Sequence, residues 1–331
     1  MKKSTFEEIS HQRWTDLEAL LTRLEHDQVP PEVRQLPKLF RQSCHDLSLA
    51  QHRMYGRKLC ERLNQLVVRS YHQLHRKTGR GAERLLGFFG QTFPQSVREE
   101  WRLCVLALVF FWGPFCAMIA AAYVAPHWIF SLLGPEEMAS LDKMHGAGAT
   151  PLNHFSKEYG DTGVHFMMFA FYVQHNIGIG LTLFGMGMLC TVGSVYALVS
   201  QGLILGAMFG YIHYTGHADN IWRFAIGHSS FELTGLVLCG VAGMRLGLGV
   251  LFPGRQTRGA SIKAAGQRAL PILLGAAGML FLAAIVEGFW SSQTTLSDEV
   301  RYTFGVLMWL IWALYFILVG RGMERGKLDD A

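Results

Sequence analysis

The chain has 331 residues, of which 50% are hydrophobic and only 17% are charged, and its formal net charge is +5. Soluble domains carry about 25% charged residues, so this composition excludes an intrinsically disordered chain and indicates a membrane protein. The 36 glycines follow no three-residue period, which excludes a collagen. The six cysteines form no CxxC pair, which excludes a zinc ribbon or a redox motif.

The first third of the chain carries most of the charge. Residues 1–102 hold 18 of the 30 basic and 12 of the 25 acidic side chains. Apolar residues recur there at helical spacing in three segments, near 5–27, 33–47 and 59–74. Three amphipathic helices bury their apolar faces against one another, so residues 1–81 are expected to form a cytoplasmic helical domain. No nucleic-acid-binding motif accompanies the basic charge, so we expect no nucleic acid partner and a position beside an anionic membrane surface.

Residues 82–102 have a different character, because leucine and phenylalanine are interspersed there with arginine and Trp101. This mixture is typical of an amphipathic helix that lies at the membrane interface. We expect Pro94 to break that helix before the first membrane span. The remaining residues, 103–331, are expected to form the transmembrane domain.

Six spans of the roughly 20 residues that a bilayer requires can be drawn in this last part. They cover residues 103–125, 164–189, 194–214, 224–251, 270–289 and 302–320. No charged residue occurs between Asp161 and Asp219, a stretch long enough for two spans. The predicted fold is therefore an all-α polytopic membrane protein with six transmembrane helices and an N-terminal cytoplasmic helical bundle.

The charges between the spans predict the orientation. The segment 253–269 carries four basic residues and no acidic one, and the tail after the last span contains Arg321, Arg325 and Lys327. The segments 126–162 and 290–300 are acidic. Because lysine and arginine remain on the cytoplasmic side, we expect a multi-pass protein of the bacterial inner membrane with both termini in the cytoplasm, as an even number of spans requires.

Glycines occur at four-residue spacing in two spans. The third span contains Gly202, Gly206 and Gly210, and the fourth contains Gly243 and Gly247. Such runs let helix backbones approach closely. We expect them to pack helices together within the chain, with a homodimer interface as the alternative. The second span is also rich in glycine after Asn176, which is typical of a kinked helix beside a binding site.

Five polar residues within the spans are the candidates for a polar core or binding site, namely His175, Asn176, His228, Glu232 and Glu287, and Arg245 is a further charged residue there. Ionisable groups at this depth are costly and face the protein interior or a partner. His228 and Glu232 share a helix face, which favours a structural polar latch and leaves an ion or proton pathway and half a metal site as alternatives. No signature of a hydrolase, kinase or zinc protease is present, so we assign no catalytic residue, no metal ligand and no cofactor. Arg245 is expected to extend to the membrane surface.

The polar motifs and the glycines together resemble the stage II sporulation protein M family. The resemblance rests on the run from His228 to Glu232 ahead of Gly243 and Gly247, with Ser229 where the family usually has glycine. The His175-Asn176 pair and the run Glu287-Gly288-Phe289 are similar to motifs of the second and fifth spans. Trp14, residues 36–40, Asp46-Leu47 and residues 63–67 resemble the longer branch of the family, which has an additional N-terminal domain.

This resemblance implies a scaffold rather than an enzyme. The sporulation members belong to a membrane complex with two peptidoglycan-degrading enzymes, and the longer members are similar to products of gene clusters that encode a AAA-type ATPase. The resemblance therefore implies a non-enzymatic scaffold or assembly factor of the cell envelope, whose partners are membrane lipids, peptidoglycan-acting enzymes or a AAA-type ATPase system. Because of the additional domain, it does not imply that the organism forms spores.

Two further functions stay open from the sequence. One is a transporter or channel with a polar site formed by His175, Asn176, His228 and Glu232, since interrupted helices near the midplane are common substrate sites. The other is an intramembrane metalloprotein or enzyme. Measuring the metal content of the purified protein would test that possibility.

Overall fold

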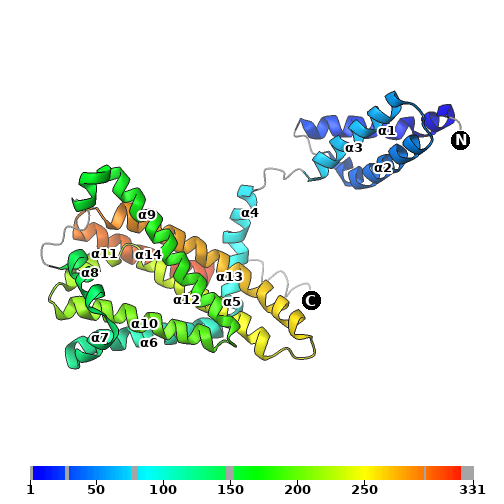
Figure 1. Ribbon diagram of the computed structural model, residues 1–331. Coiled ribbons are helices and arrows are strands. Elements are labelled where there is room, and N and C mark those ends of the chain that lie inside the picture. The colour runs from blue at the N-terminus through cyan, green and yellow to red at the C-terminus, as the bar shows by residue number, and fades with distance from the viewer. Residues whose placement is uncertain (1–2, 27–29, 76–80, 147–152, 294–295, 322–331) are drawn as a thin grey trace. The chain divides into compact units, whose positions relative to one another are not determined.

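The computed structural model describes residues 3–26, 30–75, 81–146, 153–293 and 296–321, without the side chains of 75 and 153–162. Within these residues every regular element is a helix, so the predicted all-α class is confirmed (Figure 1). The chain separates into two compact units, Met1–Arg84 and Leu85–Ala331. Among the charges that predicted the orientation, Arg325, Lys327 and the side chains of Lys157, Glu158 and Asp161 lie outside the described residues.

The N-terminal unit is the expected helical bundle. It consists of α1 (Lys3–Glu25), the 3₁₀ turn η1 (Pro31–Gln35), α2 (Leu36–His52) and α3 (Arg57–His75). Its core contains Phe6, Trp14 and a set of leucines from all three helices. The indole of Trp14 donates a hydrogen bond to Asp46 Oδ2 at 2.9 Å, and Arg13 forms an ion pair with the same carboxylate. The buried Asp46 is thus satisfied, as a charge inside a core must be.

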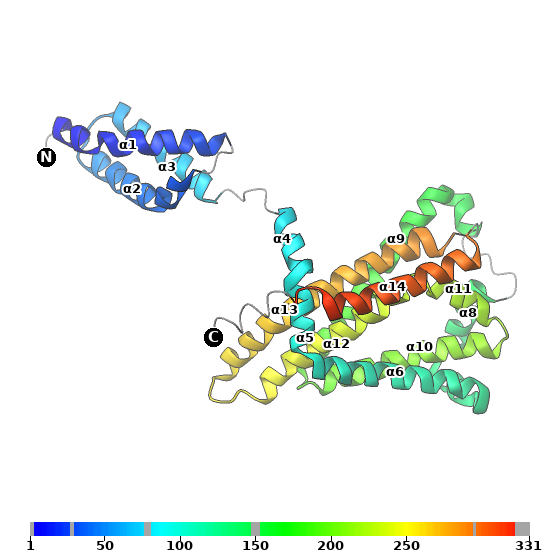
Figure 2. The same cartoon turned by 180° about the vertical axis from the view of Figure 1, so that it is seen from behind.

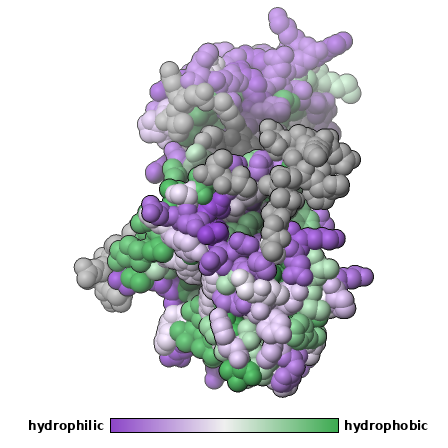
Figure 3. Space-filling view, turned by 90° about the vertical axis from the view of Figure 1, so that its left-hand side faces the viewer, coloured by the Kyte–Doolittle hydropathy of each residue, from purple (hydrophilic) through white to green (hydrophobic). Residues whose placement is uncertain are grey.

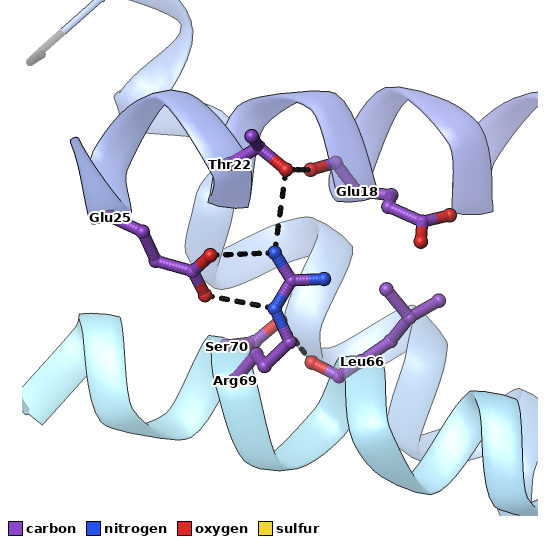
Figure 4. Close-up of polar contacts among 6 residues, drawn as sticks. All are labelled: Glu18, Thr22, Glu25, Leu66, Arg69 and Ser70. Carbon is purple, nitrogen blue, oxygen red and sulfur yellow. Dashed lines mark hydrogen bonds and ion pairs between the residues drawn. The ribbon is translucent and has the colours of Figure 1, made fainter.

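A bidentate ion pair joins α1 to α3 on the surface of this unit (Figure 4). Arg69 Nε donates to Glu25 Oε1 at 2.8 Å, and Arg69 Nη2 donates to Glu25 Oε2 at 2.7 Å. The guanidinium also reaches Thr22 Oγ1 at 3.4 Å. This geometry is stronger than that of most surface ion pairs, because two parallel hydrogen bonds fix both side chains. Hydrogen bonding from Arg69 lowers the pKa of Glu25, and partial burial opposes that shift.

Among its described residues, the second unit contains six helices that are long and apolar enough to cross a membrane, which agrees with the predicted number of spans. They are α6 (Trp101–Val124), α9 (Asn153–Gly185), α10 (Val192–Tyr214), α12 (Ser229–Leu251), α13 (Arg258–Val286) and α14 (Asp298–Leu318). Hydrophobic patches are visible on this unit, whereas the N-terminal unit is mostly hydrophilic (Figure 3). The chain is a multi-pass membrane protein.

Helix α12 is the centre of the membrane unit, and α6, α9, α10, α13 and α14 all contact it (Figure 2). In its most apolar stretch 78% of α12 is buried, compared with 11% of α14. The other membrane helices thus expose much of their surface to lipid. Three short helices pack at one end of α10, namely α7 (His127–Leu132), α8 (Pro135–His145) and α11 (Ala218–Ala225).

The boundaries of two spans differ from the prediction. Helix α13 begins at Arg258, twelve residues before the predicted start, and Thr257 Oγ1 caps it by accepting a hydrogen bond from the Ala260 amide. Three of the four basic residues assigned to a loop, Arg258, Lys263 and Arg268, are exposed on this helix, while Ala265 and Ala269 are buried. The fourth span begins at Ser229 rather than at 224, because the preceding residues form the separate helix α11.

The segment 82–102 is helical up to Glu99 and is not broken at Pro94. It consists of α4 (Gly81–Gly87), a π-helical turn η2 (Phe88–Thr92) and α5 (Phe93–Glu99). Pro94 lies in the first turn of α5, where a missing N–H is tolerated. The chain changes direction at Glu100 instead, whose φ and ψ are −100° and 26°. Phe93 is fully buried against Gly275 of α13, and the location of the segment at a membrane interface stays a prediction.

The glycine runs pack helices within one chain. A Cβ atom on Gly206 would lie 2.5 Å from the carbonyl oxygen of Phe115 on α6, and one on Gly202 would lie 2.3 Å from that of Phe111. Gly210 continues the same contact with Met118 O, at 3.0 Å from an added Cβ. On α12, Gly243 and Gly247 contact the end of α9 and the turn that follows it. These faces are therefore occupied by the chain's own backbone.

We predict that Gly206→Ala destabilises the membrane unit by about 1–3 kcal/mol, because the new methyl group overlaps the backbone of α6. The matched control is Gly178→Ala in the middle of α9, where an added Cβ meets nothing within 4 Å. Unfolding of both variants in detergent, compared with the wild type, measures the difference. Equal stability of the two variants would contradict the observed packing.

A second prediction concerns pH. The pKa of Glu25 is lowered in the folded state, so its pair with Arg69 stabilises the fold fully above the ordinary glutamate pKa of 4.5 and loses this effect as the pH falls through the lower, folded-state pKa. In a fragment of residues 1–84, urea unfolding can be followed by the fluorescence of Trp14, its single tryptophan. We expect Glu25→Gln to lower stability at pH 7 and to flatten its decline in acid. Glu32→Gln is the control, because the Glu32 carboxylate is 3.8 Å from its arginine partner.

Candidate functional site

Four polar side chains from three helices meet where α12 begins and α13 ends. Asn176 comes from α9, His228 and Glu232 from the start of α12, and Glu287 from the end of α13. Asn176, His228 and Glu287 are each at most 4% exposed, and Glu232 is slightly more accessible. These three helices pack directly against one another, so their packing alone brings the four side chains together.

Two hydrogen bonds fix the geometry of this polar cluster. Asn176 Nδ2 donates to Glu287 Oε2 at 2.7 Å, which joins α9 to α13. His228 Nδ1 and Ser291 Oγ are hydrogen-bonded at 3.0 Å, which joins α12 to the turn after α13. The other ring nitrogen, His228 Nε2, lies 3.6 Å from Glu232 Oε2 and 3.7 Å from Glu287 Oε1. These separations exceed a hydrogen bond, so the imidazole faces two carboxylates across a gap.

The end of α13 is a π-helical turn, η4 (Glu287–Ser291), that contains Glu287 and Ser291, the hydrogen-bond partner of His228. Such turns are rare and occur often at functional sites, because the additional residue changes the direction of the side chains. Gly288 allows α9 to come close, since a Cβ there would lie 2.8 Å from that of Phe169. His165 Nδ1 is hydrogen-bonded to the Gly288 carbonyl at 2.8 Å. The turn is thus held from α9 as well.

Arg301 supports the cluster from α14. Its guanidinium is buried and donates hydrogen bonds to the carbonyl oxygens of Ser291 at 3.1 Å, of Leu296 at 3.3 Å and of Gln293. A cation at the carbonyl end of a helix satisfies groups that have no partner within the helix. Arg301 therefore fixes the backbone of Ser291, the residue that orients His228. Sequence pattern alone does not mark Ser291 or Arg301 as site residues. A single arginine at the start of the last span is the feature that could have indicated Arg301.

An aromatic ring packs against the imidazole of His228. The ring of Phe224 lies 5.0 Å from that of His228 and 5.4 Å from that of His145. His145 belongs to α8, outside the spans, and burial lowers its pKa, which keeps it neutral at neutral pH. On α9, Tyr172 lies one turn before Asn176.

The structure thus brings together four of the five polar residues predicted from the sequence. His175 is the exception, because it is exposed and stacks on Phe171 with ring centroids 5.6 Å apart. Arg245 does not extend alone to the membrane surface as expected. It forms an ion pair with Glu100, with 3.0 Å between Nε and Oε1, at the bend before α6.

The cluster contains donors and acceptors that its own hydrogen bonds do not satisfy. Asn176 Oδ1 is buried and has no hydrogen-bond partner among the described residues. Within those residues, the ion pairs of Glu232 and Glu287 are with His228 alone. Two carboxylates in an apolar surrounding require neutralisation by protons or by a cation. The arrangement can therefore share protons or hold a positive ion.

Comparisons with known proteins identify both parts of the chain. A family model described as Stage II sporulation protein M matches residues 106–292, which include the whole polar cluster. A second one, described as a domain of unknown function (DUF8413), matches residues 4–76 in the N-terminal unit. No curated protein and no solved structure matches the chain.

We predict that Asn176→Ala destabilises the membrane unit by about 1–3 kcal/mol, because it leaves a buried carboxylate without its hydrogen bond. Gln174→Ala is the matched control, since Gln174 is an exposed amide on the same helix. Thermal unfolding in detergent compares the two variants with the wild type. If Asn176→Ala unfolded at the same temperature as the control, the hydrogen bond to Glu287 would have no structural role.

Proposed function

The chain belongs to the stage II sporulation protein M family, and from this premise we propose that it is a non-enzymatic scaffold or assembly factor. In this proposal it organises cell-wall or envelope machinery in the bacterial inner membrane, with both termini in the cytoplasm. The basic N-terminal unit faces the cytoplasm, and the acidic segments between the spans face the other side of the membrane.

The observation that carries this proposal is the union of two separately folded units in one chain. The N-terminal unit has its own hydrophobic core and a polar surface with ion pairs between its helices. It is therefore equipped to present a stable surface to a soluble partner while the second unit fixes it to the membrane. A AAA-type ATPase system is the cytoplasmic partner that we propose, and peptidoglycan-acting enzymes are the partners on the opposite side.

The packing of the membrane unit also supports a scaffold. Glycine contacts at Gly202, Gly206 and Gly243 place helix backbones against one another without intervening side chains. Two buried polar groups, Asn176 and Glu287, are hydrogen-bonded to each other. A unit joined in this way offers fixed surfaces, and membrane lipids surround its exposed apolar faces.

Transport is the second candidate, and the polar cluster is the observation that favours it. A transport site would contain Asn176, His228 and Glu232 with Glu287, whereas His175 lies outside it. Substrate-dependent flux in proteoliposomes, lost in Glu232→Gln, would support transport. A scaffold predicts that this substitution changes folding or partner recovery and no flux.

The scaffold proposal is tested by affinity purification of the full chain in mild detergent. We expect stoichiometric recovery of an ATPase or of a peptidoglycan-acting enzyme, measured by quantitative mass spectrometry. Deletion of residues 1–80 should remove the cytoplasmic partner and leave membrane insertion intact, because the membrane unit has its own core. Recovery of the protein alone, with the wild type and the deletion behaving identically, would contradict the proposal.

A further inference from the structure

We propose that His228, Glu232 and Glu287 bind one divalent transition-metal ion, and that zinc is the ion that fits this site best. The proposal adds a metal centre to the membrane unit and does not depend on the scaffold function. It also revises the expectation, drawn from sequence alone, of no metal ligand. The sequence shows only two ligands on one helix, His228 and Glu232. The packing of α12 against α13 brings Glu287 to them as the third.

The spacing of the three ligand atoms fits a small cation. Zinc binds imidazole nitrogen and carboxylate oxygen at about 2.0–2.2 Å in a tetrahedral arrangement, which places ligand atoms roughly 3.3–3.6 Å apart. Here His228 Nε2 is 3.6 Å from Glu232 Oε2 and 3.7 Å from Glu287 Oε1. All three ligand atoms lie within 4.8 Å of one another. Small side-chain rotations are therefore sufficient to close the site around an ion.

The surrounding hydrogen bonds have the pattern of a metal site. Metal-binding histidines use one ring nitrogen for the ion and the other for a hydrogen bond that fixes the ring. His228 does this when Nδ1 donates to Ser291 Oγ, at 3.0 Å, and Nε2 faces the carboxylates. Glu287 binds Asn176 through Oε2 and keeps Oε1 directed at the imidazole.

An unpartnered buried oxygen points to the same ligand. Asn176 is 1% exposed, its Nδ2 bonds Glu287 inside the cluster, and its Oδ1 has no hydrogen-bond partner among the described residues. An unsatisfied buried carbonyl oxygen is unfavourable. A bound ion, or a water molecule on that ion, would satisfy it, and this would complete a fourth position.

The charges and donor types select the class of ion. Within the described residues, the ion pairs of Glu232 and Glu287 are with His228 alone. One divalent cation neutralises the charge of both carboxylates. Calcium and magnesium require about six or more oxygen ligands, whereas imidazole with carboxylates suits zinc. Such an ion would join α12 to α13 directly and α9 through Asn176.

The test is the metal content of the full chain purified in detergent without chelators. We expect about one zinc ion per chain, as for a closed three-ligand site with one further donor. Glu232→Gln and Glu287→Gln should each lose the bound metal. His175→Ala and Glu299→Gln are matched controls on exposed side chains and should retain it. Ser291→Ala removes the hydroxyl that fixes the non-ligating ring nitrogen, Nδ1 of His228, and should weaken zinc binding about tenfold or more in competition with a chelator.

Wild-type protein alone can overturn the proposal, so variants that fail to fold do not prevent a decision. Absence of stoichiometric metal, even after incubation with zinc and removal of the excess, would show that the cluster shares protons instead. Equal zinc content in the two glutamine variants and the wild type would show binding elsewhere. Visible absorption of the cobalt-substituted wild type gives a second measurement, because tetrahedral and octahedral cobalt differ in colour and intensity. Partner recovery by the wild type remains a separate readout for the scaffold proposal.

Discussion

Every ionisable group that a membrane bundle buries must find its partner inside the bundle, and Glu287 is where this constraint is strongest. Its carboxylate is 4% exposed and accepts a hydrogen bond from Asn176 while it faces His228. These contacts require α9, α12 and α13 to meet at one level, and Gly288 permits the approach of α9. The polar cluster thus determines the relative position of three of the six membrane helices.

Helix α12 is held by opposite physical means at its two ends. At its start, His228 faces Glu287 and is hydrogen-bonded to Ser291, both at the end of α13. In its second half, Gly243 and Gly247 bring its backbone against the chain that leaves α9, where Thr191 Oγ1 donates to the Met244 carbonyl at 3.1 Å. A hydrogen bond orients α12 against α13 at one end, and van der Waals contact brings the backbones of α12 and the end of α9 together at the other. Together they explain why this helix is the most buried of the six.

The sequence predicts the membrane helices well, because hydropathy is a local property. The start of α13 is not predicted correctly, because a charged and exposed helical face has the same composition as a loop. Within the site, helical spacing is sufficient to join His228 to Glu232. Glu287 joins these two residues only because α13 packs against α12, and no local sequence pattern predicts how two helices pack. Neighbours such as His175 and Asn176 point about 100° apart on a helix, and only packing decides which of the two is buried.

The cluster also has a consequence for the synthesis of the protein. The partner of Asn176 lies 111 residues later in the chain. At common rates of translation this separation corresponds to a delay on the order of ten seconds. During that interval His228 and Glu232 also enter the membrane before Glu287 exists. The cluster therefore stays incomplete until α13 has been synthesised, and the hydrogen bond that joins α9 to α13 forms only when the fifth span arrives.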